Sequence, residues 1–320
     1  MIEGKRIFIT GGAGFIGSTL IGRLIEKNQI VVFDNLARDS LSDKPYRGHA
    51  NLSVVKGDVL DAGAVESAMK GANVVVHCAA IAGIDSVSKS PVRTLRVNIL
   101  GSAHVLEAAS KLEKCERAVF FSTSEIFGQH AFRVSETDRA QVGAVGEPRW
   151  VYAVGKLAEE HLAIAYHQEL GLPSVVVRPF NVYGPGQVGE GAIRNFVMRA
   201  LKDEPIQIYG DGTQIRSWCY VDDMVDAVML ALEKPAAVGQ SFNIGNERAT
   251  ATMTALVETT IRVLGSKSSV KYVKRDGPDV ELRIPATAKA TELLGFTAKV
   301  DLDEGIRRTG DHFRSHAPRK

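Results

Sequence analysis

The sequence has few cysteines, and their spacing suggests no pairing. Cys78, Cys115 and Cys219 are an odd number and stand far apart along the chain. This pattern excludes a disulfide framework and the closely spaced ligand pairs of a structural zinc site. We therefore expect a reduced, cytoplasmic protein without a metal site.

Long apolar runs and a strong charge of one sign are also missing. No run is long enough to span a bilayer. The first apolar strand begins at Arg6, which leaves no room for a signal peptide before it. The 39 lysines and arginines nearly balance the 37 aspartates and glutamates, so the net charge is +2. On these grounds we expect no nucleic acid partner and no membrane partner.

The sequence does contain short apolar strands that alternate with longer helical patterns. Helical patterns occupy Phe15–Lys27, Pro91–Lys111 and Val151–Glu169. The alternation is typical of βαβ units on a parallel sheet, and therefore predicts an α/β fold with a Rossmann-type doubly wound parallel sheet. The predicted strands are Arg6–Thr10, Ile30–Asp34, Leu52–Lys56, Val74–His77, Ala118–Ser122 and Ser174–Arg178.

The pattern changes after Pro179, where glycine and proline become frequent and the elements become shorter. We therefore expect a main domain over residues 1–180 and a smaller C-terminal region over residues 181–320. Whether a segment of this region returns to the main sheet stays open.

A glycine-rich turn follows the first predicted strand. Its spacing fits two patterns, G-x-G-x-x-G and G-x-x-G-x-x-G, and it opens an amphipathic helix. Glycine lets the backbone approach a pyrophosphate, whose charge is stabilised at the helix N-terminus. The turn therefore indicates a dinucleotide site. The expected cofactor-binding residues here are Gly11, Gly14, Phe15, Ile16 and Gly17.

An acid stands where this motif requires one, at the end of the second predicted strand. The carboxylate of Asp34 can accept hydrogen bonds from the adenosine ribose and would repel a 2′-phosphate, which favours NAD over NADP. Arg38 lies close by and could accommodate that phosphate. The other residues expected along the adenosine are Asn35, Asp58 and Val59, although a polar turn residue is the simpler interpretation of Asp58.

Tyr152 and Lys156 stand four residues apart in a helical pattern, which places them on one face. A tyrosine has a reference pKa of about 10, but a neighbouring ammonium and a nicotinamide cation both favour the phenolate. Tyr152 could then accept a hydroxyl proton while a hydride leaves the adjoining carbon. A surface pair is the alternative interpretation.

Polar side chains follow the fifth predicted strand. Thr123 can hydrogen-bond the oxygen that is oxidised, because the carboxyl ends of the strands face the ligand in such sheets. Glu125 could remove the acidic proton beside a ketone, and Ser124 could assist a departing hydroxyl. A solvated loop glutamate is the alternative for Glu125.

These segments together resemble a known family. Residues 10–17, 122–128, 152–156, 178–185 and 208–223 fall in the order seen in extended short-chain dehydrogenases. The set is similar to the NAD-dependent nucleotide-sugar epimerases and dehydratases, and it covers nearly the whole chain. The resemblance implies that residues 1–180 bind NAD and that residues 181–320 bind a UDP-sugar.

The resemblance also assigns further roles. It implies cofactor contacts for Ala79, Ala80 and Asn98, and substrate contacts for Asn181, Asn195, Arg216 and Arg275. His77 is expected to be a structural residue at a strand end. Asp222 and Asp223 are interpreted as helix N-caps and not as metal ligands. A homodimer through the helix that carries Tyr152 is expected.

The reaction is not fixed by these motifs. The triplet Thr123-Ser124-Glu125 resembles lyase members of the family, namely GDP-mannose 4,6-dehydratases and UDP-glucuronate decarboxylases. The UDP-GlcNAc 5,6-dehydratase of tunicamycin biosynthesis is a third possibility. All three begin with oxidation at C4. A decarboxylase must also bind a carboxylate, for which Arg149, Arg194 and Arg216 are available.

We expect a UDP-sugar dehydratase, with UDP-GlcNAc 5,6-dehydration as the leading hypothesis from overall resemblance. UDP-glucuronate decarboxylation and UDP-sugar 4-epimerisation stay as alternatives. A dinucleotide sensor without catalysis is a remote alternative, because such a protein would be expected to lose the Tyr152 and Lys156 pair.

Overall fold

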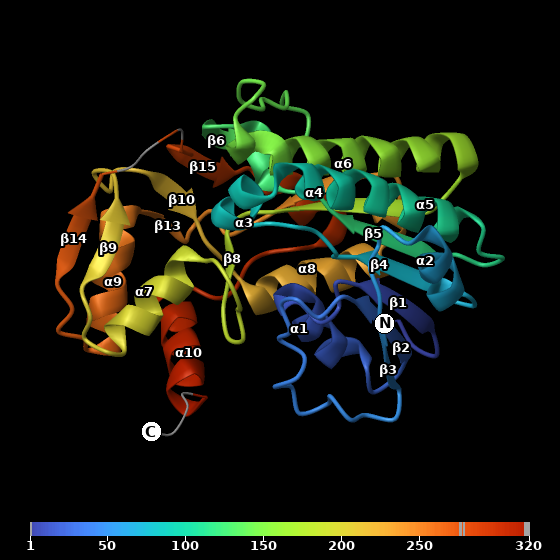
Figure 1. The fold of residues 1–320 in the computed structure, drawn as a ribbon, viewed down its shortest axis with the longest axis horizontal. Helices are drawn as coiled ribbons and strands as arrows, with labels where there is room; N and C mark the ends of the chain where they lie inside the picture. The colour runs from blue at the N-terminus through green and yellow to red at the C-terminus, as the bar shows by residue number, and fades with distance from the viewer. Residues whose placement is uncertain (1, 275–276, 278, 317–320) are drawn as a thin grey trace.

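The computed structural model describes residues 2–274, 277 and 279–316. A seven-stranded parallel sheet with the order β12-β7-β5-β4-β1-β2-β3 forms its centre (Figure 1). The strands are β1 (Arg6–Thr10), β2 (Gln29–Asp34), β3 (Leu52–Lys56), β4 (Val74–His77), β5 (Arg117–Phe121), β7 (Ser174–Pro179) and β12 (Ser241–Ile244). The predicted α/β fold with a doubly wound parallel sheet is confirmed, and the six predicted strands all form to within one residue at each end.

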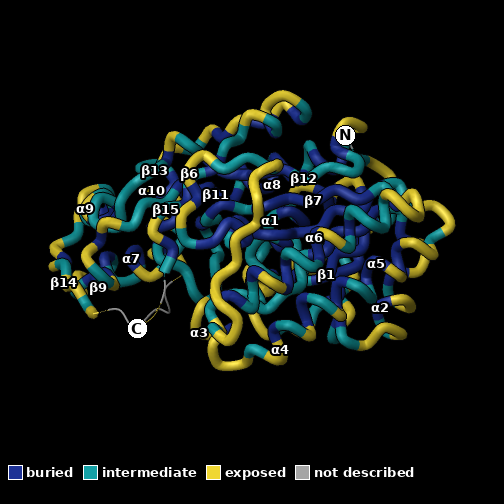
Figure 2. The backbone as a smooth tube through the Cα atoms, turned by 90° about the horizontal axis from the view of Figure 1, so that it is seen from above, coloured by how far each residue is buried: buried dark blue, intermediate teal, exposed yellow. Residues whose placement is uncertain are grey.

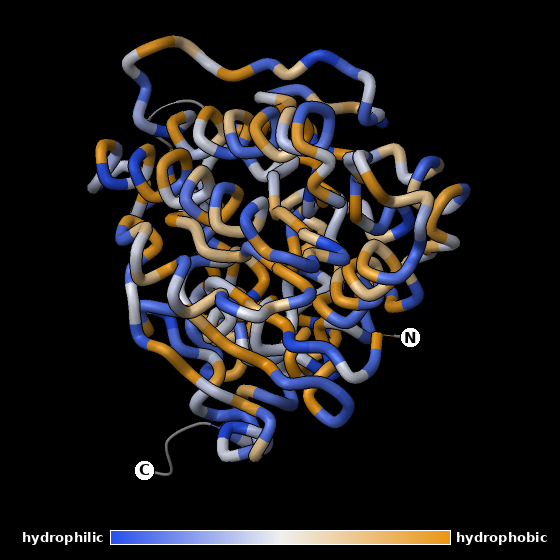
Figure 3. The backbone as a smooth tube through the Cα atoms, turned by 90° about the vertical axis from the view of Figure 1, so that its right-hand side faces the viewer, coloured by the Kyte–Doolittle hydropathy of each residue, from blue (hydrophilic) through white to orange (hydrophobic). Residues whose placement is uncertain are grey.

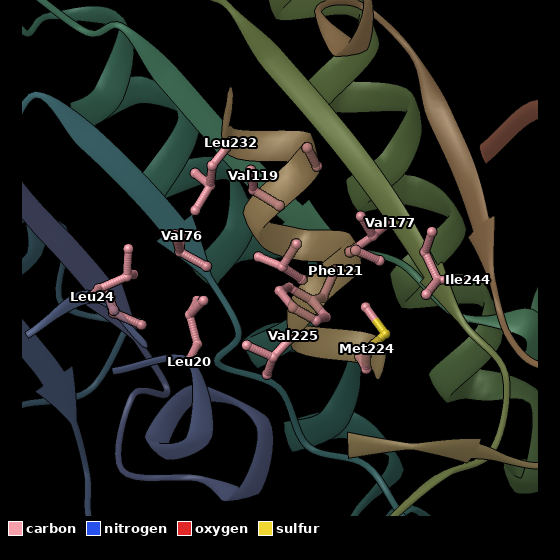
Figure 4. Close-up of a cluster of buried hydrophobic side chains, with 14 of the residues drawn as sticks. Leu20, Leu24, Val76, Val119, Phe121, Val177, Met224, Val225, Leu232 and Ile244 are labelled. Carbon is pink, nitrogen blue, oxygen red and sulfur yellow. The ribbon is translucent and has the colours of Figure 1, made fainter. Parts of the chain in front are cut away.

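Helices cover both faces of this sheet. Helices α1 (Phe15–Leu24) and α8 (Val221–Glu233) pack on one face, where Leu20, Val76 and Met224 meet in a single buried cluster (Figure 4). The other face holds α2 (Ala62–Met69), α5 (Ser102–Ser110) and α6 (Val151–Leu170). Successive strand residues point to opposite faces, so Ile7 and Phe8 belong to different clusters, as strands buried on both sides require. Figure 2 shows the central strands as buried and the outer turns as exposed.

The helical pattern at Pro91–Lys111 is not a uniform α-helix. Between α4 (Pro91–Leu95) and α5 lies a π-helical stretch, η1 (Arg96–Gly101). The wider turn makes room for one extra residue in the ladder. Within this stretch Asn98 is fully buried against the loop that follows β4. A short helix, α3 (Ile84–Lys89), precedes these elements.

The chain builds the second region around another buried cluster, which contains Trp218, Leu256 and Ile306. This region contains the strand pairs β8 (Val182–Tyr183) with β11 (Cys219–Tyr220) and β9 (Ile206–Tyr209) with β14 (Val270–Val273). Its helices are α7 (Ala192–Ala200), α9 (Met253–Leu264) and α10 (Leu302–Ser315).

A four-stranded sheet with the order β13-β10-β15-β6 joins the two regions, since it combines β6 (His130–Val134) with β10 (Ile215–Ser217), β13 (Thr250–Thr252) and β15 (Leu282–Pro285). Both α8 and β12 belong to the main layer although they follow residue 180. The question left open by the sequence is answered: a segment does return to the main sheet. That the residues from 181 onward bind the substrate stays a prediction.

Short helical turns complete the chain at η2 (Ser124–Phe127), η3 (Pro148–Trp150), η4 (Pro235–Ala237) and η5 (Ala290–Leu294). Residues 137–146 form an exposed loop between β6 and α6, which stands out from the body of the molecule (Figure 3). Within the described parts of the chain, no helix is long and apolar enough to cross a membrane.

Candidate active site

The glycine turn, Asp34 and Ala79 meet at the carboxyl ends of β1, β2 and β4. Gly11 has φ +65, and a Cβ there would stand 2.5 Å from the amide nitrogen of Ala79 after β4. A Cβ on Gly17 would stand 2.7 Å from the carbonyl oxygen of Gly11. Only glycine fits at these two points, so the loop and α1 can pack tightly against the strand ends.

The N-terminus of α1 is open to an anion. Gly14 is its N-cap residue, no side chain caps the helix, and its first turn contains no acid. The free amides of a helix N-terminus stabilise a negative charge. The first turn, which begins with Phe15 and Ile16, therefore fits the pyrophosphate of NAD.

Asp34 connects β2 to this loop. Its Oδ2 accepts a hydrogen bond from the amide of Ala13 at 3.0 Å, and its Oδ1 accepts one from the amide of Leu36 at 2.8 Å. Burial raises the pKa of Asp34, and these two amides act in the opposite direction. The carboxylate is thereby fixed beside the turn where the adenosine ribose is expected.

The other expected adenosine residues have different surroundings. Asn35 accepts a bond from the amide of Ala37 on the surface. Asp58 accepts a bond from the amide of Leu60 and forms an ion pair with Arg93 at 3.1 Å. Val59 is buried. Asp58 thus has the turn role that the simpler interpretation gave it, and a contact with adenine stays a prediction.

Asn98 fixes the loop after β4 that contains Ala79 and Ala80. Its Oδ1 accepts the amide of Ile81 at 2.9 Å, and its Nδ2 donates to the carbonyl oxygen of Ile81 at 3.2 Å. A side-chain amide that pairs with one backbone residue in both directions holds that residue like a strand neighbour. Asn98 therefore fixes the loop after β4, and its contact with the dinucleotide stays a prediction.

Thr123 lies directly after β5 and is the N-cap residue of η2, where its Oγ1 accepts the amide of Glu125 at 3.2 Å. Ser124 is buried next to it. Burial and the nearby charge of Glu125 raise the pKa of Tyr152, whereas a hydrogen bond with Thr123 lowers it. The structure therefore brings Thr123 and Tyr152 together, as the sequence predicts.

Lys156 has a partner that sequence reasoning missed. Its ammonium lies 2.6 Å from Oε2 of Glu159, and both side chains are almost completely buried. The signal was present, since residues three apart on a helix are neighbours.

Glu125 lies among arginines. Arg149 donates to both of its carboxylate oxygens, at 2.5 and 3.1 Å, and Nη1 of Arg283 lies 3.5 Å from Oε1. Burial raises the pKa of Glu125, but Arg283 and Arg149 outweigh it and hold this pKa below its usual value. Burial also lowers the pKa of Arg283 to about 10. Sequence reasoning missed Arg283, which comes from β15, 158 positions away in the chain.

The expected substrate residues are spread over the second region. Arg216 on β10 pairs with Asp279 at 3.1 Å. Asn181 donates to the carbonyl oxygen of Ser217 at 2.8 Å, and Asn195 is exposed on α7. Arg275 lies outside the described residues.

The glycine-rich stretch after β8 is fastened to the first region. Glu190 accepts bonds from the amides of Asp85 and Ser86, at 2.9 and 3.1 Å, and from the Ser86 hydroxyl at 2.7 Å. Arg38 donates to the same hydroxyl at 2.7 Å and lies 3.6 Å from Glu190. The Arg38 guanidinium is therefore bound to Ser86 and Glu190.

The interpretation of Asp222 and Asp223 as N-caps is wrong. The N-cap residue of α8 is Tyr220, without a side-chain cap, and both acids lie in the first turn. Asp223 accepts the amides of Lys299 and Val300 instead, because the chain segment before α10 passes across it. In the described residues, no three His, Cys, Asp or Glu side chains form a group that could bind a metal ion.

Comparison with known proteins agrees with this geometry. Residues 7–245 match the model of the NAD dependent epimerase/dehydratase family. The chain is similar to UDP-glucuronic acid decarboxylase 5 of Arabidopsis thaliana, with 34% identity over 97% of this chain and 89% of that one. It is 31% identical to UDP-N-acetyl-alpha-D-glucosaminuronate decarboxylase of Bacillus cytotoxicus, over 97% of this chain and 98% of the relative.

A solved structure shares the architecture. UDP-glucuronic acid 4-epimerase from Bacillus cereus, in complex with UDP-glucuronic acid and NAD, superposes with a TM-score of 0.88 at 27% identity. The match covers 97% of this chain and 99% of that chain.

Proposed function

The chain belongs to the NAD dependent epimerase/dehydratase family, and on that premise we propose that it is a UDP-sugar lyase that decarboxylates a UDP-hexuronate through a C4 ketone. The family is NAD-dependent, and the glycine turn, the uncapped α1 and the fixed Asp34 fit that cofactor. The similarity to two decarboxylases supports the choice of reaction.

The observation that carries the proposal is the engagement of Glu125. Both of its oxygens already accept charge-assisted bonds from Arg149, and its pKa is held low. Such a carboxylate is a poor proton acceptor, since a general base must have a free oxygen and a pKa near the working pH. Dehydration needs a base at C5, whereas decarboxylation needs none.

The charge around Glu125 also suits an acidic sugar. Three guanidinium groups, from Arg149, Arg216 and Arg283, face two carboxylates, from Glu125 and Asp279. These five groups carry one surplus positive charge. A buried carboxylate on the substrate needs such a cation, because an unpaired charge in a buried site is costly.

The chemistry then divides among residues of this chain. NAD, which the glycine turn, the N-terminus of α1 and Asp34 would hold, would supply the hydride acceptor and donor for C4. Burial raises the pKa of Tyr152, so Tyr152 would accept the C4 hydroxyl proton with the help of the nicotinamide cation of bound NAD, which favours the phenolate. Thr123 would hold the same oxygen, so that a ketone forms. The C5–C6 bond breaks as carbon dioxide leaves, and its electron pair moves toward the C4 oxygen, where Tyr152 and Thr123 can donate hydrogen bonds. A proton from solvent is then added to C5 in place of the lost carboxylate.

The 5,6-dehydratase expected from the sequence remains the second candidate. It is favoured by Ser124, whose buried hydroxyl stands next to Glu125 and could assist a departing C6 hydroxyl. In that reaction Glu125 would have to release one oxygen from Arg149.

Product analysis separates these reactions. The NAD-loaded protein is incubated in D2O with UDP-glucuronate, UDP-N-acetylglucosaminuronate, UDP-GlcNAc and GDP-mannose, and the products are identified by mass spectrometry and NMR. We expect loss of carbon dioxide from a uronate, with deuterium at C5. Loss of water from UDP-GlcNAc or GDP-mannose would replace decarboxylation with dehydration, and an isomer of unchanged mass would indicate an epimerase. The Tyr152→Phe protein is the control.

A further inference from the structure

Glu159 is a fully buried carboxylate on the helix that carries Tyr152 and Lys156. Its Oε2 lies 2.6 Å from the ammonium of Lys156, and the two side chains are 0% and 2% exposed. Burial raises the pKa of Glu159, while the Lys156 charge acts against this. A lysine so deeply buried would tend to lose its proton if it lacked a counter-charge.

A chain of buried hydrogen bonds leads away from Glu159 across three elements. The hydroxyl of Ser102 on α5 lies 2.9 Å from Oε2 of Glu159. Nε2 of His77 on β4 lies 3.0 Å from that hydroxyl, and Nδ1 of His77 lies 2.6 Å from Oγ1 of Thr10 on β1. Helix α6 is thus connected to β1, the strand that leads into the glycine turn.

The direction of each hydrogen bond in this series can be assigned by starting from its two ends. An ionised Glu159 and the carbonyl oxygen of Asn98 only accept, and the Ser102 hydroxyl lies 2.9 and 2.8 Å from them, so the single proton of Ser102 points to one of these two oxygens. His77 is held neutral, because burial and the Lys156 charge lower its pKa. Its Nε2–H then donates to Ser102, and its bare Nδ1 accepts the Thr10 hydroxyl, which itself accepts the amide of Ala79 at 3.4 Å. The bonds from Thr10 and from His77 therefore both run toward Ser102.

We propose that Glu159 is a positioning residue of the reaction: it holds Lys156 in place as a buried ammonium and ties it through Ser102 and His77 to the strand of the cofactor turn. The inference rests on the proposed role of Tyr152 and Lys156, not on which sugar is the substrate. Without Glu159, Lys156 is a buried cation with no counter-charge, and it releases its proton at a lower pH.

The charged and titratable groups that face this pair come from two elements. Tyr152 and Glu160 lie on α6, and His77 and Cys78 lie at the end of β4. Burial holds both β4 groups uncharged at neutral pH, since it lowers the pKa of His77 and raises that of Cys78 to about 12. Glu160 is paired with Arg178 at 2.7 Å. None of these groups replaces Glu159 as the partner of Lys156.

The pH dependence of stability tests whether the Lys156 ammonium needs the charge of Glu159, and this measurement requires no substrate. In the cofactor-free protein, Glu159→Gln leaves a lysine whose pKa is depressed in the folded state, so the unfolded state binds more protons and stability rises with pH. We expect the urea midpoint of this variant to fall most near pH 7 and to recover toward the ordinary lysine pKa of about 10. Adding Lys156→Met to Glu159→Gln removes the cation and should restore the midpoint at pH 7.

Kinetics test the positioning role. In the NAD-loaded enzyme, we expect Glu159→Gln to move the alkaline limb of the kcat profile to lower pH by about one unit or more, which is at least tenfold in the proton affinity of Lys156. Glu159→Asp keeps the charge and is the matched control, which should keep the wild-type limb at a reduced kcat.

A double variant no more stable than Glu159→Gln, together with a wild-type alkaline limb in Glu159→Gln, would overturn the inference. If Glu159→Gln does not fold but the double variant with Lys156→Met does, the result supports the inference. Since the stability measurement uses no sugar, it is independent of whether the proposed decarboxylation is correct.

Discussion

The carboxylate of Asp34 and the amide of Ala13 are joined by a hydrogen bond of 3.0 Å, so one side chain connects the end of β2 to the glycine turn. Both carboxylate oxygens of Asp34 already accept backbone amides. They can still accept hydroxyl donors, because each carboxylate oxygen has two lone-pair sites. Asp34 therefore both shapes the turn and is available to a ribose.

We expect Asp34→Ala to lower the NAD content of the purified protein and to destabilise it by about 1–3 kcal/mol, since two partly buried amides lose their acceptor. Bound cofactor is measured by chromatography after acid release, and stability by urea unfolding. The control is Asp211→Ala, where the carboxylate accepts the amide of Thr213 on the surface of the second region. Full NAD content in Asp34→Ala would contradict the assignment.

The ion pair between Arg149 and Glu125 predicts a dependence of stability on acid. The pKa of Glu125 in the folded protein lies below its ordinary value of 4.5. The contribution of Glu125 to the free energy of unfolding is therefore fully present above about pH 4.5. It is lost as the pH falls through the lower pKa that Glu125 has in the folded protein. We expect Arg149→Met to make this loss shallower in urea unfolding between pH 3 and pH 7. The exposed ion pair of Lys27 and Glu3 supplies the control, Lys27→Met. An unchanged acid dependence in Arg149→Met would sink the argument.

A contact between two helices predicts the effect of one methyl group. A Cβ on Gly155 of α6 would stand 2.9 Å from the Cβ of Asn98, which has no freedom to move aside because its side chain holds Ile81. We expect Gly155→Ala to cost about 1–3 kcal/mol of stability by overpacking. Gly48→Ala is the matched control, since a Cβ there would meet nothing within 4 Å. Equal unfolding midpoints for the two variants would contradict this.

The predicted homodimer can be tested on the helices expected to form it. Val92 on α4, Leu100 on η1 and Val154 on α6 are exposed by 71, 44 and 40% of their surface. If these helices face a second copy, Val154→Glu places a charge in a buried contact and should yield monomers in light scattering after gel filtration. Val145→Glu, in the exposed loop, should leave the mass unchanged. A wild-type protein that is already monomeric would end the hypothesis.

Local patterns predicted six strands of the main sheet and the glycine turn that follows the first of them. Apolar runs indicated the six strands, and the glycine spacing with Asp34 indicated the cofactor turn, because both depend on neighbours in the sequence. Arg283 could not be found in this way. It reaches Glu125 only because β15 pairs with β6, and nothing in the residues around Arg283 indicates that pairing.

Two further differences have physical reasons. Asp223 fits a capping pattern, but its oxygens accept amides from residues 299 and 300, a contact decided by tertiary packing. A π-helical stretch that contains Asn98 stands where the sequence predicted a regular helix. The energy of one extra residue in a helical turn depends on the contacts of Asn98, which its helix propensity does not describe. Glu159, in contrast, lay within reach of sequence reasoning.

The position of β12 at the edge of the main sheet has a consequence for synthesis. β12 pairs along β7 through residues 241–244, so the sheet is complete only after about three quarters of the chain has left the ribosome. Until then the backbone groups on one side of β7 have no partner, and this strand is an open template for other chains. A fragment that stops at residue 180 keeps the whole glycine turn, but one edge of β7 has no strand to pair with. The part of the chain that was expected to bind the sugar thus also protects the nascent main sheet from pairing with other chains.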